Sequence, residues 1–198
     1  MYRKVALLLG VLIAMSACGP KGFIKGEYDE DVRSDNLLND RWSESDMQRV
    51  VKDLVAKMLK SRHIQNARKP PIIMVTRLRN ETEEHINTDS IMDMVRVELQ
   101  NASEVEFVNK SARDDVADEY EYQNSGMVSK ETKKGPGSQI GADFILDGAL
   151  TTNVQDINKK KTVYYKVTMN LTNLNTNVIK WTGYKELRKK YKKRRMGL

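Results

Sequence analysis

Few side chains in this sequence are suited to covalent or acid–base chemistry: one cysteine and two histidines. His85 follows Glu84 and lies near Asn80, so these three could supply a general base and the groups that orient it. His63 stands at the end of an expected helix, where a cation suits the helix dipole. The sequence has neither a glycine-rich nucleophile elbow nor a His-Glu-x-x-His metal pair. We therefore expect no catalytic residue, no metal and no cofactor.

The residues before Cys18 have the pattern of a secretory signal: two basic residues, an apolar run from Val5 to Met15, and two small residues. The run is shorter than the roughly 20 residues that span a bilayer as a helix. The segment resembles the lipobox of bacterial lipoproteins, with Met15 where the family usually carries Leu. The resemblance implies that residues 1–17 are removed and that Cys18 is acylated. The alternatives are an uncleaved membrane helix or an ordinary buried cysteine.

An acylated Cys18 fixes the compartment, because about two acyl chains are enough for stable anchoring in a membrane. Gly19 follows the cysteine, where an aspartate would resemble an inner-membrane retention signal. We therefore expect an outer-membrane lipoprotein that faces the periplasm. An intramolecular disulfide is excluded because the sequence has one cysteine, and thiol catalysis and cysteine metal sites are excluded because the anchor uses Cys18. The net charge of +7 then favours anionic lipid or an acidic protein partner and no nucleic acid.

Residues 18–42 are expected to be a flexible tether that follows the lipidated cysteine. The stretch is rich in Gly, Asp and Asn, and its large apolar residues are sparse and without period. Such a segment cannot bury enough apolar surface to fold alone. From Gly19 to Arg41 it would reach about 75 Å at full extension.

The folded domain is expected to span residues 43–187. Ser43 with Asp46, and Ser45 with Gln48, have the spacing of capping boxes, which predicts the start of a helix. Trp42 comes just before them and is expected to fold over the helix start. The apolar residues that follow recur at three- and four-residue steps and so share one helix face. They are Met47, Val50, Val51, Leu54, Val55, Met58 and Leu59.

Helices and strands alternate through the rest of this domain. We expect a buried strand at 72–75, a polar segment at 76–88, a helix capped by Thr88, a strand at 105–108 and an acidic helix capped by Ser111. A basic loop at 126–137, a helical turn at 138–142 and strands at 143–150, 162–174 and 178–184 complete the order. The acidic helix lacks the spacing of a calcium loop. The sequence predicts a mixed α/β sheet with an antiparallel C-terminal meander, flanked by about three helices.

Three stretches resemble the LpoB family of outer-membrane lipoproteins, which activate class A penicillin-binding proteins. The first is the helix at 45–59. The second is Arg-Asn-Glu-Thr-Glu-Glu-His-Ile-Asn-Thr at 79–88, where Asn87 replaces the family's Asp. The third is Gly-Ala-Asp-Phe-Ile-Leu-Asp-Gly at 141–148, where Phe144 replaces Tyr. The resemblance implies a fold similar to the N-terminal domain of TolB.

The resemblance also implies a regulator and not an enzyme. Such a protein reaches from the outer membrane through the cell wall, docks on a noncatalytic domain of a peptidoglycan synthase and stimulates it. The expected partner is a class A penicillin-binding protein, and the expected activator is a monomer. The partner-binding residues would be Arg79, Asn80, Thr82, Glu84 and His85. The alternative for this segment is a hydrogen-bonded junction that orients the strand and the helix.

Residues 188–198 are expected to form a disordered basic tail, because a block of like charges repels itself. It could hold the domain to anionic lipid, wall polymers or an acidic synthase face, with strong salt dependence. The alternative is a tail that only adds solubility. The cations are Lys189, Lys190, Lys192, Lys193, Arg194 and Arg195.

Two functions of other classes remain open at this stage. One is a structural lipoprotein subunit of an envelope secretion or curli-type assembly, which predicts rings or large oligomers on sizing. The other is a passive tether between membrane and peptidoglycan, which predicts wall binding without any synthase.

Overall fold

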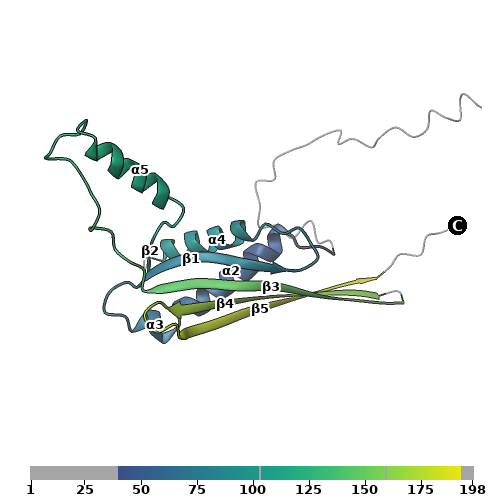
Figure 1. Ribbon diagram of the computed structural model, residues 1–198. Helices are drawn as coiled ribbons and strands as arrows, with labels where there is room; N and C mark the ends of the chain where they lie inside the picture. Colours follow the sequence, from purple (N-terminus) through teal and green to yellow (C-terminus); the bar gives the residue numbers. More distant parts are fainter. Residues whose placement is uncertain (1–39, 103, 159, 193–198) are drawn as a thin grey trace, which may run out of the picture. The chain divides into compact units, whose positions relative to one another are not determined.

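The structure is a computed structural model that describes residues 40–102, 104–158 and 160–192 (Figure 1). The chain divides into two units, residues 1–32 and 33–198, and every described residue belongs to the second. The predictions for the signal segment, for Cys18 and for tether residues up to 39 lie outside the described residues. So do those for Lys193, Arg194 and Arg195.

A five-stranded mixed sheet forms the centre of the described unit, with strand order β2-β1-β3-β4-β5. β1 runs parallel to both β2 and β3, and β3, β4 and β5 form an antiparallel meander. The predicted fold class and C-terminal meander are therefore confirmed. The strands are β1 (Ile72–Glu81), β2 (Glu106–Phe107), β3 (Phe144–Ile157), β4 (Lys160–Asn173) and β5 (Ile179–Lys192).

Two helices cover one face of this sheet, α2 (Glu44–Leu59) and α4 (Thr88–Asn101) (Figure 1). α2 packs on β5 and on α4, and α4 packs on β1 and β2. The short helix α3 (Arg62–Gln65) follows α2. The predicted apolar face of α2 is largely buried: Val50, Val51, Leu54, Val55 and Met58 belong to the core, and Met47 and Leu59 pack at its margin.

The period-two alternation of β4 explains why the sheet has one apolar face. The predicted inward residues Val163, Tyr165, Val167, Met169 and Leu171 are all buried. Their neighbours Lys166, Thr168 and Asn170 alternate with them and are only partly buried. Successive side chains of a strand point to opposite faces, so the residues between the buried ones lie on the face that α2 and α4 leave open.

Several expected boundaries were wrong. β1 continues to Glu81 through a register irregularity between Val75 and Leu78, because pairing with β3 satisfies the backbone of a segment that reads as polar loop. Asn87, and not Thr88, caps α4, since its side chain accepts a hydrogen bond from the Ser90 amide. Residues 138–142 form no helical turn.

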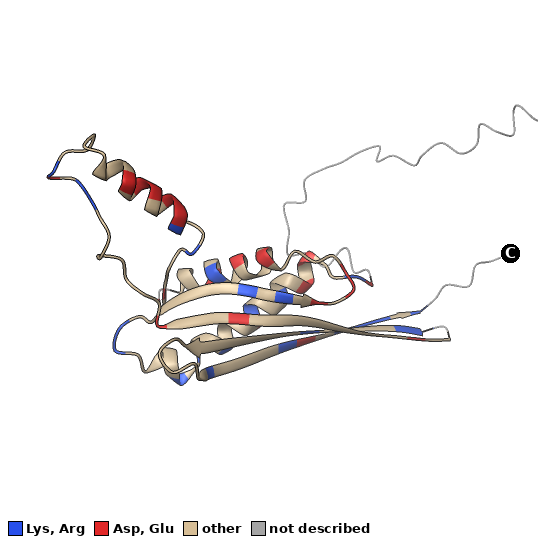
Figure 2. Ribbon diagram, in the orientation of Figure 1, with Lys and Arg blue, Asp and Glu red and all other residues tan. Residues whose placement is uncertain are grey.

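The acidic helix is α5 (Arg113–Asn124), and its expected cap by Ser111 is absent, because Ala112 occupies the N-cap position. None of the residues of α5, all of which the structure describes, is buried. Its acidic residues Asp114, Asp115, Asp118, Glu119 and Glu121 are exposed, as the solvated-face prediction requires (Figure 2).

The prediction of a disordered basic tail is wrong for residues 188–192. β5 extends to Lys192, so Lys189, Lys190 and Lys192 belong to a strand that pairs with β4 along its whole length. Lys189 is buried and lies within ion-pair distance of Asp46 on α2. The run of basic residues predicted disorder because the sequence near Lys189 holds no partner for its charge. That partner, Asp46, comes from the other end of the domain.

Candidate binding site at the start of the folded domain

The segment between β1 and α4 is held by hydrogen bonds among its own residues. The side-chain nitrogen of Asn80 donates to the Glu84 backbone carbonyl over 2.8 Å. The backbone amide of Thr82 donates to the side-chain oxygen of Asn80 over 3.1 Å. The Thr82 hydroxyl accepts from the Glu84 amide over 3.1 Å. Polar side chains near the end of β1 thus turn the chain toward α4. This arrangement matches the hydrogen-bonded junction that the sequence left open as an alternative.

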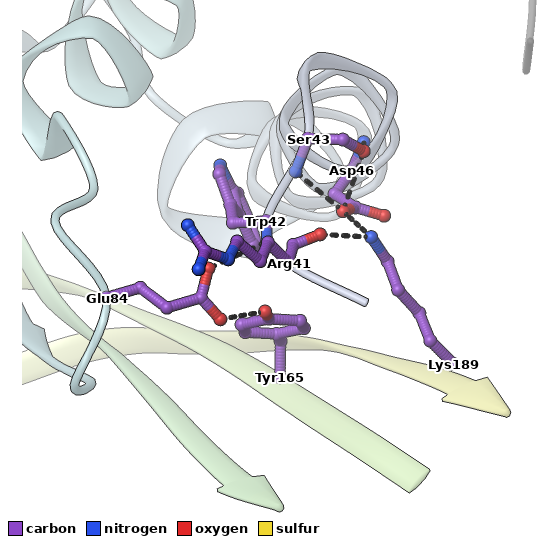
Figure 3. A network of polar contacts seen from close by, with 7 residues as sticks. All are labelled: Arg41, Trp42, Ser43, Asp46, Glu84, Tyr165 and Lys189. Atoms are coloured by element: carbon purple, nitrogen blue, oxygen red, sulfur yellow. Dashed lines mark hydrogen bonds and ion pairs between the residues drawn. The ribbon is translucent and has the colours of Figure 1, made fainter. Parts of the chain in front are cut away.

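The Glu84 carboxylate points away from this turn and joins two other parts of the domain (Figure 3). One oxygen accepts from the Trp42 backbone amide over 2.9 Å, and the other accepts from the Tyr165 hydroxyl. Burial, and then the hydrogen bond to Glu84, raise the pKa of Tyr165 well above its ordinary value. Tyr165 therefore stays a neutral donor. The Trp42 ring also packs edge-on against the Tyr165 ring, with centroids 5.4 Å apart.

Lys189 ties the same stretch of chain to β5 (Figure 3). Its ammonium donates to the Arg41 carbonyl over 2.7 Å and forms an ion pair with Asp46, and the two charged side chains are only 7% and 5% exposed. Asp46 also accepts from the Ser43 amide over 2.9 Å, which completes the predicted capping box. The Lys189 ammonium lies 5.8 Å from the Tyr165 ring centroid, so the buried cation also faces an aromatic surface.

Asp40 completes the attachment of the chain before α2. Its carboxylate accepts from the Lys161 ammonium on β4 over 2.6 Å. This hydrogen bond lowers the pKa of Asp40 and raises that of Lys161. Residues 40–43, which we call the docked segment, are thus bound to β4, β5 and the β1–α4 turn. The sequence had placed residues 40–42 in the flexible tether.

A groove of about 870 Å³ lies beside the docked segment. Apolar side chains contribute to its wall, from Trp42, Met47, Ile86 and Val154. Charged or titratable side chains of both signs stand beside them, including Glu83, His85 and Lys161. Glu83 and His85 are exposed. A mixture of apolar and charged groups on an open surface suits contact with another protein.

The five predicted partner-binding residues fall into separate environments. Asn80, Thr82 and Glu84 form the turn and its link to the docked segment, and Glu84 and His85 both line the groove. Arg79 does not line it and instead pairs with Glu81 on β1, with 3.1 Å between nitrogen and oxygen. Both Glu84 oxygens are directed to Trp42 and Tyr165, so the general base suggested by His85, Glu84 and Asn80 is not assembled.

Tyr165 and Lys161 were not predicted as site residues, since only the pairing of β4 with β3 and β5 brings them to the docked segment. Across the described ranges, no three His, Cys, Asp or Glu side chains gather closely enough to hold a metal ion. Among the helices that the structure describes, none is long and apolar enough to cross a membrane.

Comparisons with known proteins place the chain in a family. The sequence profile described as "Peptidoglycan-synthase activator LpoB" matches residues 46–187. A sequence comparison with curated proteins found no significant match.

Among solved structures, the LpoB C-terminal domain from Salmonella enterica aligns with 18% identity and a TM-score of 0.48, over 73% of this chain and 99% of that one. The C-terminal domain from Escherichia coli aligns with 19% identity and a TM-score of 0.47, over 72% and 98%. The NMR structure of E. coli LpoB aligns with 16% identity and a TM-score of 0.46, over 88% and 81%. Since the family profile covers most of the folded domain, this chain belongs to the LpoB family of peptidoglycan-synthase activators.

Proposed function

We propose that this chain is a periplasm-facing outer-membrane lipoprotein that binds and activates a class A penicillin-binding protein. The observation that carries the proposal is the family match, which spans the domain from the first turn of α2 to β5. The signal segment and Cys18 support the lipid anchor. The chain acts as a monomeric regulator and not as an enzyme.

The synthase docks in the groove beside the docked segment. The apolar wall of the groove can bury apolar surface of a partner, and the exposed Glu83 and His85 can form polar contacts with it. Asn80 and Thr82 serve this surface indirectly, because their hydrogen bonds hold the turn that presents Glu83 and His85. The hydrogen bonds of Glu84 and Lys189 set the shape of the groove before any partner arrives, which lowers the cost of ordering on binding.

Activation follows if the domain binds the active conformer of the synthase more tightly than its resting conformer. A differential affinity of about 1.4 kcal/mol shifts the ratio of the two conformers tenfold. The activator supplies no reacting group in this scheme.

The test measures glycan polymerisation by the organism's own class A synthases on lipid II, with and without the full chain in detergent. We expect one synthase to be accelerated and to bind the chain. If no synthase is accelerated or bound, the proposal is wrong. Sizing of the same preparation should give a monomer, and a stable ring would contradict the activator role.

A double variant, Glu83→Ala with His85→Ala, tests the docking surface. Truncating two central contacts should weaken synthase binding about tenfold. Arg79→Ala is the matched control, because Arg79 is an exposed residue of β1 outside the groove. Equal losses of synthase affinity in the double variant and in Arg79→Ala would show that the synthase does not bind in the groove.

A further inference from the structure

A second groove, of about 550 Å³, lies on the opposite face of the same strand ends. Thr152 and Val154 line the first groove, whereas Asn153 and Gln155, which alternate with them along β3, line the second. Neighbouring residues of one strand therefore serve different surfaces. The second groove is open to solvent on the sheet face that α2 and α4 do not cover.

The side chains of this groove form two rows across β3, β4 and β5. One row is Gln155, Thr162 and Lys190, which are direct cross-strand neighbours. The strand spacing makes a row about 10 Å wide. The amide and the hydroxyl of this row both donate and accept hydrogen bonds, whereas the ammonium only donates.

The second row repeats this chemistry two residues along the strands, about 7 Å away. It consists of Asn153, Tyr164 and Arg188. The Arg188 guanidinium lies 5.9 Å from the Tyr164 ring centroid, so cation and ring are held together. The Glu186 carboxylate also lines the groove, and its interaction with the Tyr164 hydroxyl raises the pKa of Tyr164. The β5 member of both rows is a cation.

The chemistry of the rows identifies the ligand class. Amide and hydroxyl side chains suit the hydroxyl and acetamido groups of a sugar, and the aromatic ring offers a flat apolar face. The two cations suit carboxylates, in charge-assisted hydrogen bonds. A site for an acidic protein surface would carry a denser set of cations. Here two of the three side chains in each row are neutral, which favours a sugar polymer over an acidic protein.

We propose that this groove binds a carboxylate-bearing glycan strand, the class of polymer to which peptidoglycan belongs. Arg188 and Lys190 lie just past residue 187, where the family match ends. The cations of the site therefore lie outside the residues that the family profile matches, in a strand whose basic residues Figure 2 shows. Because the two grooves lie on opposite faces, the domain can hold a glycan while its other face stays open to a protein partner.

The test is sedimentation of the full chain in detergent with purified peptidoglycan sacculi at rising concentrations. Arg188→Gln with Lys190→Gln removes both cations and should weaken binding about tenfold. Asn153→Ala, which changes no charge, should weaken it several-fold. The matched control is Lys60→Gln with Lys180→Gln, which removes two exposed cations outside the groove and should leave binding within about twofold.

Equal losses in the two double variants would overturn the inference, since binding would then follow net charge alone. Competition supplies the second arm. Soluble muramic-acid-containing glycan fragments should displace the chain from sacculi at lower concentration than polyglutamate with the same number of carboxylates. If polyglutamate competes as well, the occupant is an acidic polypeptide and the glycan assignment is wrong. The assay contains no synthase, so its result does not depend on the proposed activation.

Discussion

Lys189 is a lysine whose charge is held inside the folded domain by partners from distant parts of the chain. The Asp46 carboxylate balances the charge and the Arg41 carbonyl accepts a further hydrogen bond. A buried ion pair adds little stability compared with apolar residues of the same size, but removing one partner leaves an uncompensated charge. The pair therefore makes the attachment of the docked segment specific to this position.

The first prediction concerns Asp46. Replacing it by Asn leaves the Lys189 ammonium buried without its counter-charge and weakens the cap of α2, so the free energy of unfolding should fall by about 3 kcal/mol. Urea denaturation measures the loss. Asp93→Asn is the control, because Asp93 pairs with Arg96 on the surface with 66% of its side chain exposed. It should cost about 0.5 kcal/mol, and equal losses would contradict the buried pair.

The second prediction concerns Tyr165 and the free energy of unfolding at alkaline pH. Burial and the hydrogen bond to Glu84 raise its pKa, so the folded protein keeps this proton at a pH where the unfolded chain releases it. This contribution to stability is complete below the ordinary tyrosine pKa of 10.0 and declines as the pH rises above it. Between about pH 9 and 11 the wild type should lose more unfolding free energy than Tyr165→Phe. Parallel pH profiles would show that Tyr165 is not responsible.

Gly148 matters to the pairing of β1, β3 and β4, since its backbone passes close to its neighbours. A Cβ atom at this position would lie 2.2 Å from the Thr168 carbonyl oxygen and 2.9 Å from Leu78 Cδ1. Gly148→Ala should therefore reduce the free energy of unfolding by about 2–3 kcal/mol, because strand backbone has to move. Gly135→Ala is the control, since nothing lies within 4 Å of a Cβ there. It should change stability by less than about 0.5 kcal/mol, and a similar loss in both would refute the close approach.

The elements differ in how far their sequence reveals them. β4 could be predicted from its own alternation, because the inward residues from Val163 to Leu171 are apolar or aromatic and Lys166, Thr168 and Asn170 between them are polar. β1 could not be predicted beyond Val75, since the irregularity before Leu78 breaks the alternation and the stabilising partner is β3, far along the chain. The end of β5 was missed for a related reason: Lys189 occupies an inward position where a pattern-based prediction expects an apolar residue.

The same limit applies to the site. The capping box and the turn around Asn80 and Thr82 are both local, so spacing identified the first, and the polar composition of residues 76–88 indicated the second. Tyr165 and Lys161 meet the docked segment only after the sheet has formed. These contacts join residues that are far apart in the sequence, so no short motif predicts them.

At the scale of the whole molecule, we expect the segment between β2 and β3 to be dispensable for folding. α5, which the structure describes in full, buries none of its residues, and Met127 and Ile140 beyond it are 75% and 68% exposed. Replacing residues 112–140 by about six Gly and Ser residues should change the free energy of unfolding by less than about 1 kcal/mol, since the end of β2 and the start of β3 lie two strand spacings apart. Urea denaturation tests this. A loss of several kcal/mol would show that the segment supports the core.

The docked segment also determines where mechanical load enters the fold. If Cys18 carries the proposed lipid anchor, residues 19–39 lie between it and the docked segment in the sequence, and a chain of that length spans at most about 70 Å. A pull along them meets the contacts of Asp40 with Lys161, of Arg41 with Lys189 and of Trp42 with Glu84 before it reaches α2. These contacts border the first groove, so the same few bonds would resist tension from the proposed anchor and hold the shape of the proposed docking surface.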